Sequence, residues 1–531
     1  MIIDARTISS GETIECDVCI VGAGPAGITI AHELCNQGLN ILLLESGGIK
    51  YEKNLEQLNH GEVNLSVHTP LEQYRRRQIG GATTFWGGRC VPFDESDFEV
   101  RPHVPHSGWP ITKTELNPYY QRAHTYCEIG QYEYAAEKAL SESGRRKMIS
   151  GFESADVSIE HLYLFSPPTD FGRKYLDSLK RSQNVNVFIY ATCLKIITNS
   201  AGTRVDYLQV ASMQKNEFLV SARQFILAAG GLEVTRLLLV SNDVYANGIG
   251  NQHDLLGRFY MGHINHLFDV KFKSPEKVMW DYEKTPDGVY CQRQIAIAEN
   301  KRQQYGLLNQ RVFMERPKIS DPSHRSSILS ATYLLKGVLN QQKKYRYPSQ
   351  HVRNILFDFD TILKFSHKWM TKRILSDRKL PSVVAKSASG IYTFRVDSEQ
   401  VPNPESRVSL SRNKDAFGIN QLKVDWRCTE LDVNSISKSV FLIGEAFAKA
   451  GVGELQSLPT IFPSAQGGHH LGTTRMSETP QTGVVDVNGR VHGLSNLYIA
   501  SSSVFATASY ANPTLTVVAL AIRLADYLKK L

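Results

Sequence analysis

The chain has 531 residues, of which 42% are hydrophobic and 21% are charged, and its formal net charge is +8. These ordinary globular values exclude a disordered chain and predict a large core divided over about two to four domains. The sequence shows neither an apolar run long enough to span a bilayer nor a signal-peptide pattern, and its eight cysteines are scattered. We therefore expect a cytoplasmic protein with reduced thiols and no transmembrane segment.

The first predicted elements are a strand, a helix and a second strand within about 30 residues. An apolar run at 18–21 ends at Gly22, a helix is predicted over 25–37 until Gly38, and a second apolar run covers 41–44. Strands that are apolar on both faces are typical of a parallel sheet covered by helices. The spacing therefore predicts a βαβ unit.

Gly22, Gly24 and Gly27 form the pattern G-x-G-x-x-G between this strand and helix. The first glycine permits a tight turn, the second lets the backbone approach a pyrophosphate, and the third allows close packing. Glu45 ends the second strand and can accept hydrogen bonds from ribose hydroxyls. The pattern predicts a dinucleotide site, and the carboxylate argues against the 2′-phosphate of NADP. It leaves NAD and FAD open.

Later elements suggest how the chain is organised. Thr112 and Glu115 form a capping box before a helix, and 225–241 is predicted as strand, glycine pair and helix. The end of the chain is predicted as strand, long loop and a helix from about residue 513. Both ends of the chain show the pattern strand, glycine and helix, and the middle does not. We therefore predict an α/β protein (α+β overall). A Rossmann-like domain takes 1–110, 185–264 and 465–531, and a substrate domain with a mostly antiparallel sheet and helices takes 111–184 and 265–464.

A basic segment interrupts the middle of the chain. Between Lys343 and Lys386 there are eleven Lys and Arg residues against three acidic ones. Its apolar residues predict an amphipathic helix that packs on its own domain: Leu356, Phe359, Ile362, Leu363 and Phe365. We expect a solvated face there and no nucleic-acid binding. An anionic substrate, a membrane surface and an acidic partner protein remain the functional alternatives.

Further motifs resemble those of the glucose–methanol–choline (GMC) flavoprotein oxidoreductases, in the branch near pyranose oxidases and bacterial sugar and alcohol dehydrogenases. They are, beside the fingerprint and "LLLESGG", the stretches "RRRQIGGATTFWGGRC" (75–90), "FILAAGGLEVTRLLLVS" (225–241), "LLGRFYMGH" (255–263), "EQVPNPESRVSLS" (399–411), "HHLGTTRM" (469–476) and "YANPTLT" (510–516). The resemblance implies bound FAD and the oxidation of an alcohol group.

The resemblance also implies that a histidine, with a second histidine or an asparagine, stands before the flavin. The motif order assigns these catalytic roles to His470 and Asn512. Adjacent side chains of a strand point to opposite sides, so only one of His469 and His470 faces the flavin, and we expect His469 to be structural. An imidazole can accept the hydroxyl proton at neutral pH while carbon gives a hydride to flavin N5. Asn512 can hold the same oxygen without adding charge.

The cofactor contacts that the resemblance implies are spread along the chain. They are Gly22, Gly24, Pro25, Ala26, Gly27, Glu45, Ser46, Gly80, Gly81, Thr84, Trp86, Gly87, Gly88, Cys193, Ala229, Gly230, Ser502, Asn512, Pro513 and Thr514. Phe85 stands where some sugar oxidases of this branch attach FAD through a histidine, which predicts non-covalent FAD. No metal site is predicted.

The substrate class is inferred from the resemblance. The resemblance favours a sugar, glycoside or polyol, with oxygen or an acceptor protein taking the electrons, and an oligomer is possible. Tyr510, Phe85 and Trp86 are candidate walls of the substrate pocket, while His263 and His266 are interpreted as surface histidines or as residues near its mouth. A redox-neutral lyase on the same flavin fold, an NAD-dependent dehydrogenase and a non-catalytic binding protein that uses the basic segment remain alternatives.

Overall fold

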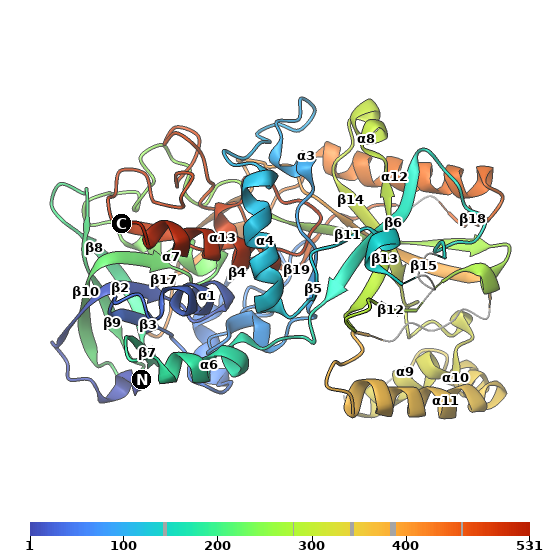
Figure 1. The fold of residues 1–531 in the computed structure, drawn as a ribbon, viewed down its shortest axis with the longest axis horizontal. Helices are drawn as coiled ribbons and strands as arrows, with labels where there is room; N and C mark the ends of the chain where they lie inside the picture. The colour runs from blue at the N-terminus through green and yellow to red at the C-terminus, as the bar shows by residue number, and fades with distance from the viewer. Residues whose placement is uncertain (142–145, 280, 340–344, 383–388, 458–459) are drawn as a thin grey trace.

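A computed structural model describes residues 1–141, 146–279, 281–339, 345–382, 389–457 and 460–531. Figure 1 shows a mostly parallel sheet at one end of the molecule, where both termini lie, and an antiparallel sheet at the other. The helices of residues 327–369 form a separate arm below the second sheet. The predicted fold class, a dinucleotide domain joined to a sheet-rich domain, is confirmed.

The parallel sheet is built from distant parts of the chain. Its order is β1 (Ile2–Asp4), β7 (Val185–Ile189), β3 (Ile41–Leu44), β2 (Thr13–Val21), β10 (Glu217–Leu227), β9 (Val205–Ala211) and β8 (Thr192–Thr198), with β20 (Leu497–Ile499) also paired to β10. The strands from β1 to β10 run parallel, and β9 and β8 are antiparallel. Every residue of β3 is buried, as a strand covered on both faces requires.

Helices join the N-terminal βαβ unit to the end of the chain. Helix α1 (Pro25–Leu34) packs against α13 (Thr514–Leu528) and α6 (Phe171–Arg181). Helix α4 (Lys113–Cys127) begins at the predicted capping box, where Glu115 N–H donates to Thr112 Oγ1 over 3.2 Å, and it packs on α13. The domain boundaries proposed above remain a prediction.

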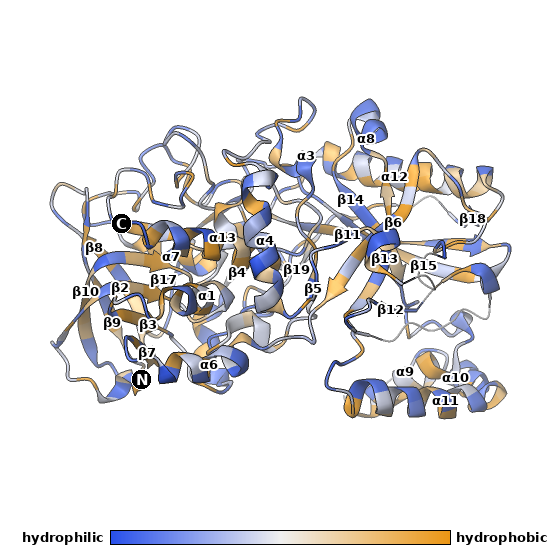
Figure 2. Cartoon of the chain, in the orientation of Figure 1, coloured by the Kyte–Doolittle hydropathy of each residue, from blue (hydrophilic) through white to orange (hydrophobic). Residues whose placement is uncertain are grey.

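The second sheet is antiparallel. Its order is β18 (Gly453–Leu455), β11 (Met261–Phe272), β15 (Ile391–Ser398), β14 (Gln310–Glu315), β13 (Tyr290–Ile297), β6 (Val157–Phe165) and β5 (Arg89–Cys90), with β19 (Ala465–Leu471) on β11 and β12 (Glu283–Lys284) on β13. Helix α12 (Glu430–Lys449) packs on this sheet, and a small third sheet contains β16 (Arg407–Lys414), β17 (Asn420–Asp425) and β4 (Gly61–Val63). Figure 2 shows apolar residues along the strands of both larger sheets.

Further helices are α7 (Gly231–Val240), which follows β10, and the short α2 (Lys53–Glu56), α3 (Glu95–Phe98), α5 (Ala136–Ala139) and α8 (Glu299–Tyr305). Among the described residues, no helix is at once long and apolar enough to cross a bilayer.

The helical arm contains α9 (Ser327–Leu339), α10 (Pro348–Phe357) and α11 (Phe359–Trp369), followed by a π-helical turn at Met370–Ile374. The predicted helical segment is confirmed, but the expectation that its apolar residues pack inward is wrong. Leu356 is 73% exposed, and Phe359 and Leu363 are each 56% exposed. Helix α10 turns a polar face inward, as described below, and α11 has no fully buried residue, although Ile362 and Phe365 are half-buried. Lys343, Lys344 and Lys386 of the basic segment lie outside the described residues.

Candidate active site

The glycines in the turn between β2 and α1 have two different roles. Two of them allow backbone segments to pack closely, and the third leaves open space at the start of α1. A Cβ on Gly22 would lie 2.7 Å from the carbonyl oxygen of Ala228, and one on Gly27 would lie 1.9 Å from that of Gly22. At Gly24 nothing lies within 4 Å of the corresponding position. Gly22 and Gly27 therefore permit the close approach of backbone segments. The open position at Gly24, at the N-terminus of α1, fits a pyrophosphate.

Glu45 lies at the end of β3 next to this turn. The Ala23 N–H donates to its Oε2 over 2.9 Å, and the Gly47 N–H donates to its Oε1 over 2.8 Å. Burial raises the pKa of the Glu45 carboxyl, and these two amides act in the opposite direction. Oε1 also accepts from Ser46 Oγ over 3.4 Å, so Oε2 is the oxygen that keeps a further lone pair for a ribose hydroxyl. The neighbouring Ser46 accepts a hydrogen bond from Arg77 Nη1 over 3.1 Å.

Residues 80–88 close on the same turn. The Gly80 N–H donates to the carbonyl of Ala23 over 2.8 Å, and a Cβ on Gly81 would lie 3.0 Å from the Cα of Gly24. Trp86 is held from the side, because its Nε1 donates to the carbonyl of Thr169 over 2.9 Å. Of the predicted contacts in this segment, Gly80 and Gly81 therefore lie against the dinucleotide turn, and the others follow them in sequence: Thr84, Trp86, Gly87 and Gly88.

The turn from β10 into α7 connects the dinucleotide turn to the histidine strand. A Cβ on Gly22 would lie 2.7 Å from the Cα of Ala229, and one on Gly231 would lie 2.4 Å from the carbonyl oxygen of His470. Between them Gly230 has a φ of +82°, with nothing within 4 Å of a Cβ position. Ser502 Oγ donates to the same His470 carbonyl over 2.8 Å. The backbone of β19 therefore lies directly beside the predicted cofactor residues.

His470 takes part in a chain of three hydrogen-bonded rings. Its Nδ1 lies 2.7 Å from the Tyr260 hydroxyl, which lies 2.8 Å from His68 Nε2. His68 Nδ1 is 2.6 Å from the carbonyl oxygen of Thr69. Because a carbonyl oxygen can only accept a hydrogen bond, His68 Nδ1 carries the proton of this ring. If both imidazoles are neutral, the Tyr260 hydroxyl donates to His68 Nε2 and accepts from His470 Nδ1–H. His470 Nε2 is then left with a lone pair.

His469 points to the other side of β19 and meets a different set of partners. Its Nδ1 lies 2.9 Å from His263 Nδ1, and its Nε2 lies 3.2 Å from Asn512 Nδ2. His263 Nε2 is 3.3 Å from the carbonyl of Ala508, which fixes the proton of His263 on that nitrogen. His263 Nδ1 therefore accepts from His469 Nδ1–H, and His469 Nε2 is left as a base that faces the Asn512 amide.

The structure brings Asn512 to His469 and not to His470, which corrects the pairing expected from the sequence. The predicted alternation along a strand is confirmed, since the two imidazoles have separate partners on opposite sides of β19. Motif spacing alone could not decide which side meets the loop before α13. His263, interpreted as a surface or mouth residue, is buried against His469.

Burial lowers the pKa of both histidines well below its usual value, and the neighbouring imidazoles and guanidinium groups act in the same direction, because each would repel a second positive charge. For His469 these are His263, His470, Arg395 and Arg89, and for His470 they are His68 and Arg75. Both imidazoles are therefore neutral at pH 7, as a proton acceptor must be.

The remaining predicted residues lie near the site in different ways. Pro513 and Thr514 are half-buried at the start of α13, directly after Asn512, and Cys193 follows Ala191, whose N–H donates to the Glu45 carbonyl over 2.8 Å. Tyr510 is buried against Tyr163 and the Arg311 guanidinium, so the expectation that it lines an open substrate wall is wrong. Tyr260 and His68 are site residues that were not predicted from the sequence. Tyr260 lies inside the quoted stretch 255–263, whereas no sequence signal marked His68.

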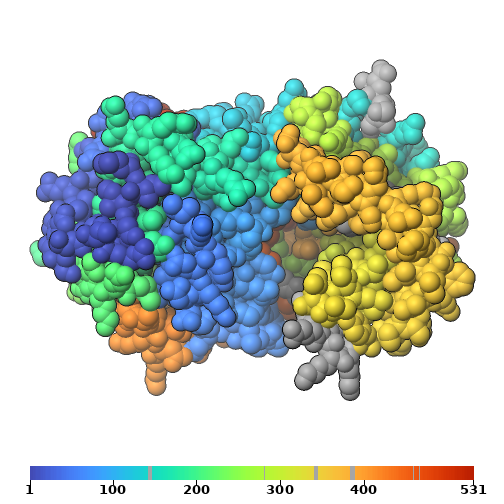
Figure 3. Space-filling model, turned by 90° about the horizontal axis from the view of Figure 1, so that it is seen from below, coloured from blue at the N-terminus to red at the C-terminus, as the bar shows by residue number. Residues whose placement is uncertain are grey.

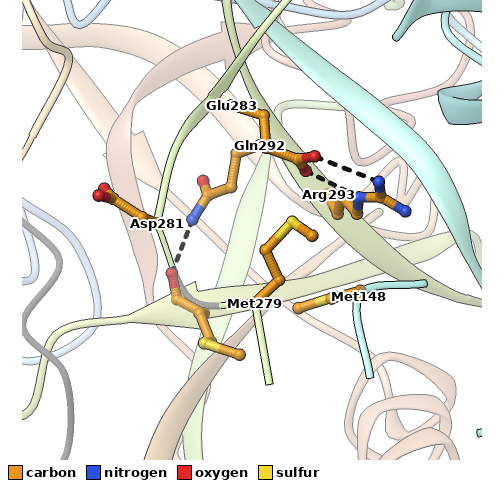
Figure 4. A pocket seen from close by; sticks show the side chains of 7 residues that line it. Met148, Met279, Asp281, Glu283, Gln292 and Arg293 are labelled. Carbon is orange, nitrogen blue, oxygen red and sulfur yellow. Dashed lines mark hydrogen bonds and ion pairs between the residues drawn. The ribbon is translucent and has the colours of Figure 1, made fainter. Parts of the chain in front are cut away.

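Two cavities lie elsewhere. The one in Figure 4 has a volume of about 10 Å³ and is lined by three methionines and by the ion pair of Glu283 and Arg293, 2.7 Å apart. It holds at most a water molecule. A larger cavity of about 710 Å³ opens beside His106, Phe259 and Arg475. None of the predicted cofactor or catalytic residues lines either cavity. Figure 3 shows a separate hollow between the arm and the first domain, with atoms of the C-terminal segment visible at its floor.

The residues present fit FAD. The open position at Gly24 admits a pyrophosphate, Glu45 Oε2 offers a lone pair to a ribose, and the turns at Gly81, Gly230 and Ser502 lead from there to the histidine strand. Among the described residues, no cluster of His, Cys, Asp or Glu side chains has the arrangement of a metal site.

Known protein families match the two ends of the chain. An FAD binding domain family matches residues 15–54, and a GMC oxidoreductase family matches residues 402–521. The chain is 24% identical to the fructose dehydrogenase large subunit of Gluconobacter japonicus, over 97% of this chain and 98% of that protein. It is 23% identical to the paromamine 6'-oxidase of Streptomyces fradiae, over 96% and 90%.

The fold is also similar to solved structures. The crystal structure of pyridoxine 4-oxidase from Mesorbium loti superposes with a TM-score of 0.58 at 17% identity, over 96% of this chain and 99% of that one. This likeness supports the two-domain fold described above.

Proposed function

We propose that this chain, which belongs to the GMC oxidoreductases and uses FAD, oxidises an alcohol group of a sugar, glycoside or polyol. The main support for the proposal is that His469 Nε2 and Asn512 Nδ2 lie 3.2 Å apart. His469 is on β19, whose backbone contacts the turn that begins α7. Two relatives named for fructose and paromamine support the substrate class.

FAD supplies the hydride acceptor when it is bound. The alcohol carbon loses a hydride and its hydroxyl loses a proton, which yields a carbonyl. His469 Nε2 takes that proton when the substrate hydroxyl replaces the Asn512 N–H at its single lone pair, and the ring is neutral beforehand. Asn512 orients the same oxygen through its amide N–H.

His263 acts as a positioning residue in this proposal. It accepts the Nδ1–H of His469 over 2.9 Å and so keeps the proton off Nε2. The ring pair is T-shaped, with centroids 4.6 Å apart, which also fixes the plane of the His469 imidazole. His470, tied to Tyr260 and His68, holds the other side of β19 in this account.

The cofactor is held without a covalent bond in this proposal. Its predicted attachment position carries Phe85, whose ring stacks under Arg76 with 4.6 Å between guanidinium carbon and ring centroid, and a phenyl ring offers no nucleophile. Acid precipitation of the yellow enzyme should therefore release all flavin into the supernatant. Colour that stays in the pellet would contradict this point.

The protein is proposed to work in the cytoplasm, because its cysteines are free thiols. Oxygen or an acceptor protein would reoxidise the enzyme. Which of them does so is decided by mixing the reduced enzyme with air-saturated buffer or with an anaerobic acceptor.

An anaerobic reduction screen tests the proposed function. The FAD-loaded enzyme is mixed with sugars, glycosides, polyols and simple alcohols, and the flavin absorbance near 450 nm is followed. We expect at least one polyhydroxylated compound to bleach the flavin while its carbonyl product accumulates in equal amount. Product formation without bleaching would instead support a redox-neutral lyase. A purified chain that takes up no flavin when given excess FAD would contradict the proposal entirely.

A further inference from the structure

The helical arm carries an unusual share of exposed apolar surface. Of the exposed large apolar side chains in the described residues, twelve of twenty-five belong to it: Leu335, Val338, Leu339, Tyr347, Val352, Leu356, Phe357, Phe359, Leu363, Met370, Ile374 and Leu375. Isolated exposed apolar residues are ordinary on a protein surface, but a concentration of this kind marks an interaction site.

Helix α10 is turned opposite to an ordinary surface helix. His351 and Asn354 face the interior, where His351 Nδ1 lies 3.1 Å from Ser330 Oγ and Asn354 Nδ2 donates to the carbonyl of Pro322 over 2.8 Å. Leu356 and Phe357 face outward and are 73% and 82% exposed. Polar contacts of α10 therefore help to hold the arm together, beside the buried Leu329 and Tyr333, while Leu356 and Phe357 remain exposed.

The apolar residues of α11 form one stripe. Phe359, Leu363, Met370 and Ile374 are separated by four, seven and four residues, which places them on one side of the helix and of the turn that follows it. Figure 2 shows apolar residues mixed with polar ones on these helices. Among the described residues, the stripe is exposed along its whole length.

The same segment is basic. Described residues 345–382 contain eight Lys and Arg residues against Asp358, Asp360 and Asp377. Lys364 pairs with Asp360, and Lys368 pairs with Asp281. The other six cations form no ion pair with an acidic side chain of the described residues: Arg346, Arg353, Lys372, Arg373, Arg378 and Lys379. Of these, Arg373 and Arg378 donate to backbone carbonyls. The positive charge beside the apolar stripe is therefore largely uncompensated.

We propose that the helical arm docks on an anionic lipid bilayer. Leu and Phe side chains interleaved with Lys and Arg are the composition of helices that lie in a bilayer interface, where apolar groups enter the acyl boundary and cations meet anionic headgroups. The core of a protein–protein interface is instead depleted of charges, so a folded partner fits this face less well. The arm borders the hollow of Figure 3, so the docked enzyme turns that side to the bilayer.

Vesicle sedimentation of the FAD-loaded enzyme tests this inference without any substrate. Vesicles of phosphatidylcholine with about one third phosphatidylglycerol should bring the enzyme into the pellet at low salt, and added salt should weaken the binding. Vesicles of phosphatidylcholine alone should bind at least about tenfold more weakly. Enzyme that stays in the supernatant with both vesicle types would overturn the inference.

Two triple variants locate the surface. Phe357→Ser with Phe359→Ser and Leu363→Ser removes exposed apolar groups, and Arg353→Glu with Lys372→Glu and Lys379→Glu reverses charge. Each should weaken binding to the anionic vesicles by about tenfold or more. Matched controls are Leu65→Ser with Val100→Ser and Phe462→Ser, and Lys50→Glu with Arg412→Glu and Lys423→Glu, all exposed and outside the arm.

The bound flavin spectrum reports that each variant is folded. Equal binding by the arm variants and the controls would overturn the assignment of the surface. A doubled mass in sedimentation velocity that the apolar variant returns to the monomer value, without vesicle binding, would show that a second copy covers the arm instead.

Discussion

The pair of His263 and His469 determines which nitrogen of His469 is free to accept a proton. Changing His263→Leu removes the acceptor for His469 Nδ1–H, so the imidazole can rotate or change its tautomer. We expect flavin reduction by the preferred alcohol to slow by about tenfold or more, and the pH profile of the reduction rate to shift. Stopped-flow absorbance under anaerobic conditions measures both.

Two companion variants separate positioning from packing. His263→Gln keeps an acceptor oxygen at this position and should recover part of the rate. His266→Leu, on the same strand but half-buried and outside the histidine pair, should change the rate by less than about threefold. Equal losses in His263→Leu and His266→Leu would contradict the role given to His263.

The depressed pKa of His469 predicts where activity fails in acid. Because the folded-state pKa lies well below 6.5, the imidazole remains neutral as pH falls through 6.5 and is protonated only below it. The rate of flavin reduction should therefore be flat from pH 8 to pH 6.5 and fall only in more acidic solution. An acid limb centred at or above pH 6.5 would show that another group is the base.

The kinds of residue in the site could be predicted from the sequence, but not which of them lie side by side. Alternation along the strand correctly separated His469 from His470, and Asn512 was correctly singled out for a position beside a histidine. The choice between the two histidines depends on which side of β19 faces the loop before α13. That relation joins segments more than 30 residues apart and is set by packing alone.

In the turn between β2 and α1, substitutions of two glycines should have different effects, one on FAD binding and one on stability. A Cβ on Gly24 meets no protein atom within 4 Å, whereas one on Gly27 meets the Gly22 carbonyl at 1.9 Å. Gly24→Ala should fold with an unchanged thermal transition of the flavin-free protein and yet bind much less FAD, since the methyl group enters the pyrophosphate space. Gly27→Ala should lower the thermal transition itself, by a strain of about 1–3 kcal/mol.

The ratio of flavin to protein absorbance and a thermal melt of the flavin-free forms distinguish the two variants. Full flavin content in folded Gly24→Ala would contradict the placement of the pyrophosphate at the start of α1.

The sequence predicts an element well where its pattern is local. The unit β2–α1–β3 and the capping box at Thr112 follow from apolar runs, glycines and a side-chain cap within a few residues. Helix α10 shows the limit of this reasoning. Its amphipathic pattern was correct, but which side is turned inward depends on polar partners such as Ser330, and no local rule gives them.

At the scale of the whole molecule, buried neutral histidines predict loss of stability in acid. Burial lowers the pKa of His124 to about 4, with Nδ1 3.1 Å from the Gly130 carbonyl and Nε2 3.0 Å from the Tyr134 hydroxyl. Between pH 6.5 and 4 the unfolded chain binds a proton that the folded chain does not bind. Stability is therefore fully present above pH 6.5 and is lost as pH falls, by up to about 2 kcal/mol at pH 5 from this residue.

Urea unfolding at pH 7 and pH 5 measures this loss. His124→Asn should reduce the difference between the two free energies of unfolding, even if it lowers both. An unchanged difference would contradict the part given to His124.

The division of the chain into a dinucleotide domain and a sheet-rich domain was predictable because both ends repeat the strand–glycine–helix pattern. The orientation of the arm was not, and neither was the contact of β19 with the turn that begins α7, because strands and turns far apart in sequence meet only in the folded chain.

The central claim is that His469, held by His263 and facing Asn512, accepts the substrate proton. The most direct measurement is the anaerobic rate of flavin reduction in His469→Ala and His470→Ala, with the same alcohol and with full FAD occupancy confirmed for each. We expect a loss of about 10²- to 10⁴-fold in His469→Ala and less than about tenfold in His470→Ala. The reverse order, with His470→Ala inactive and His469→Ala near the normal rate, would contradict it.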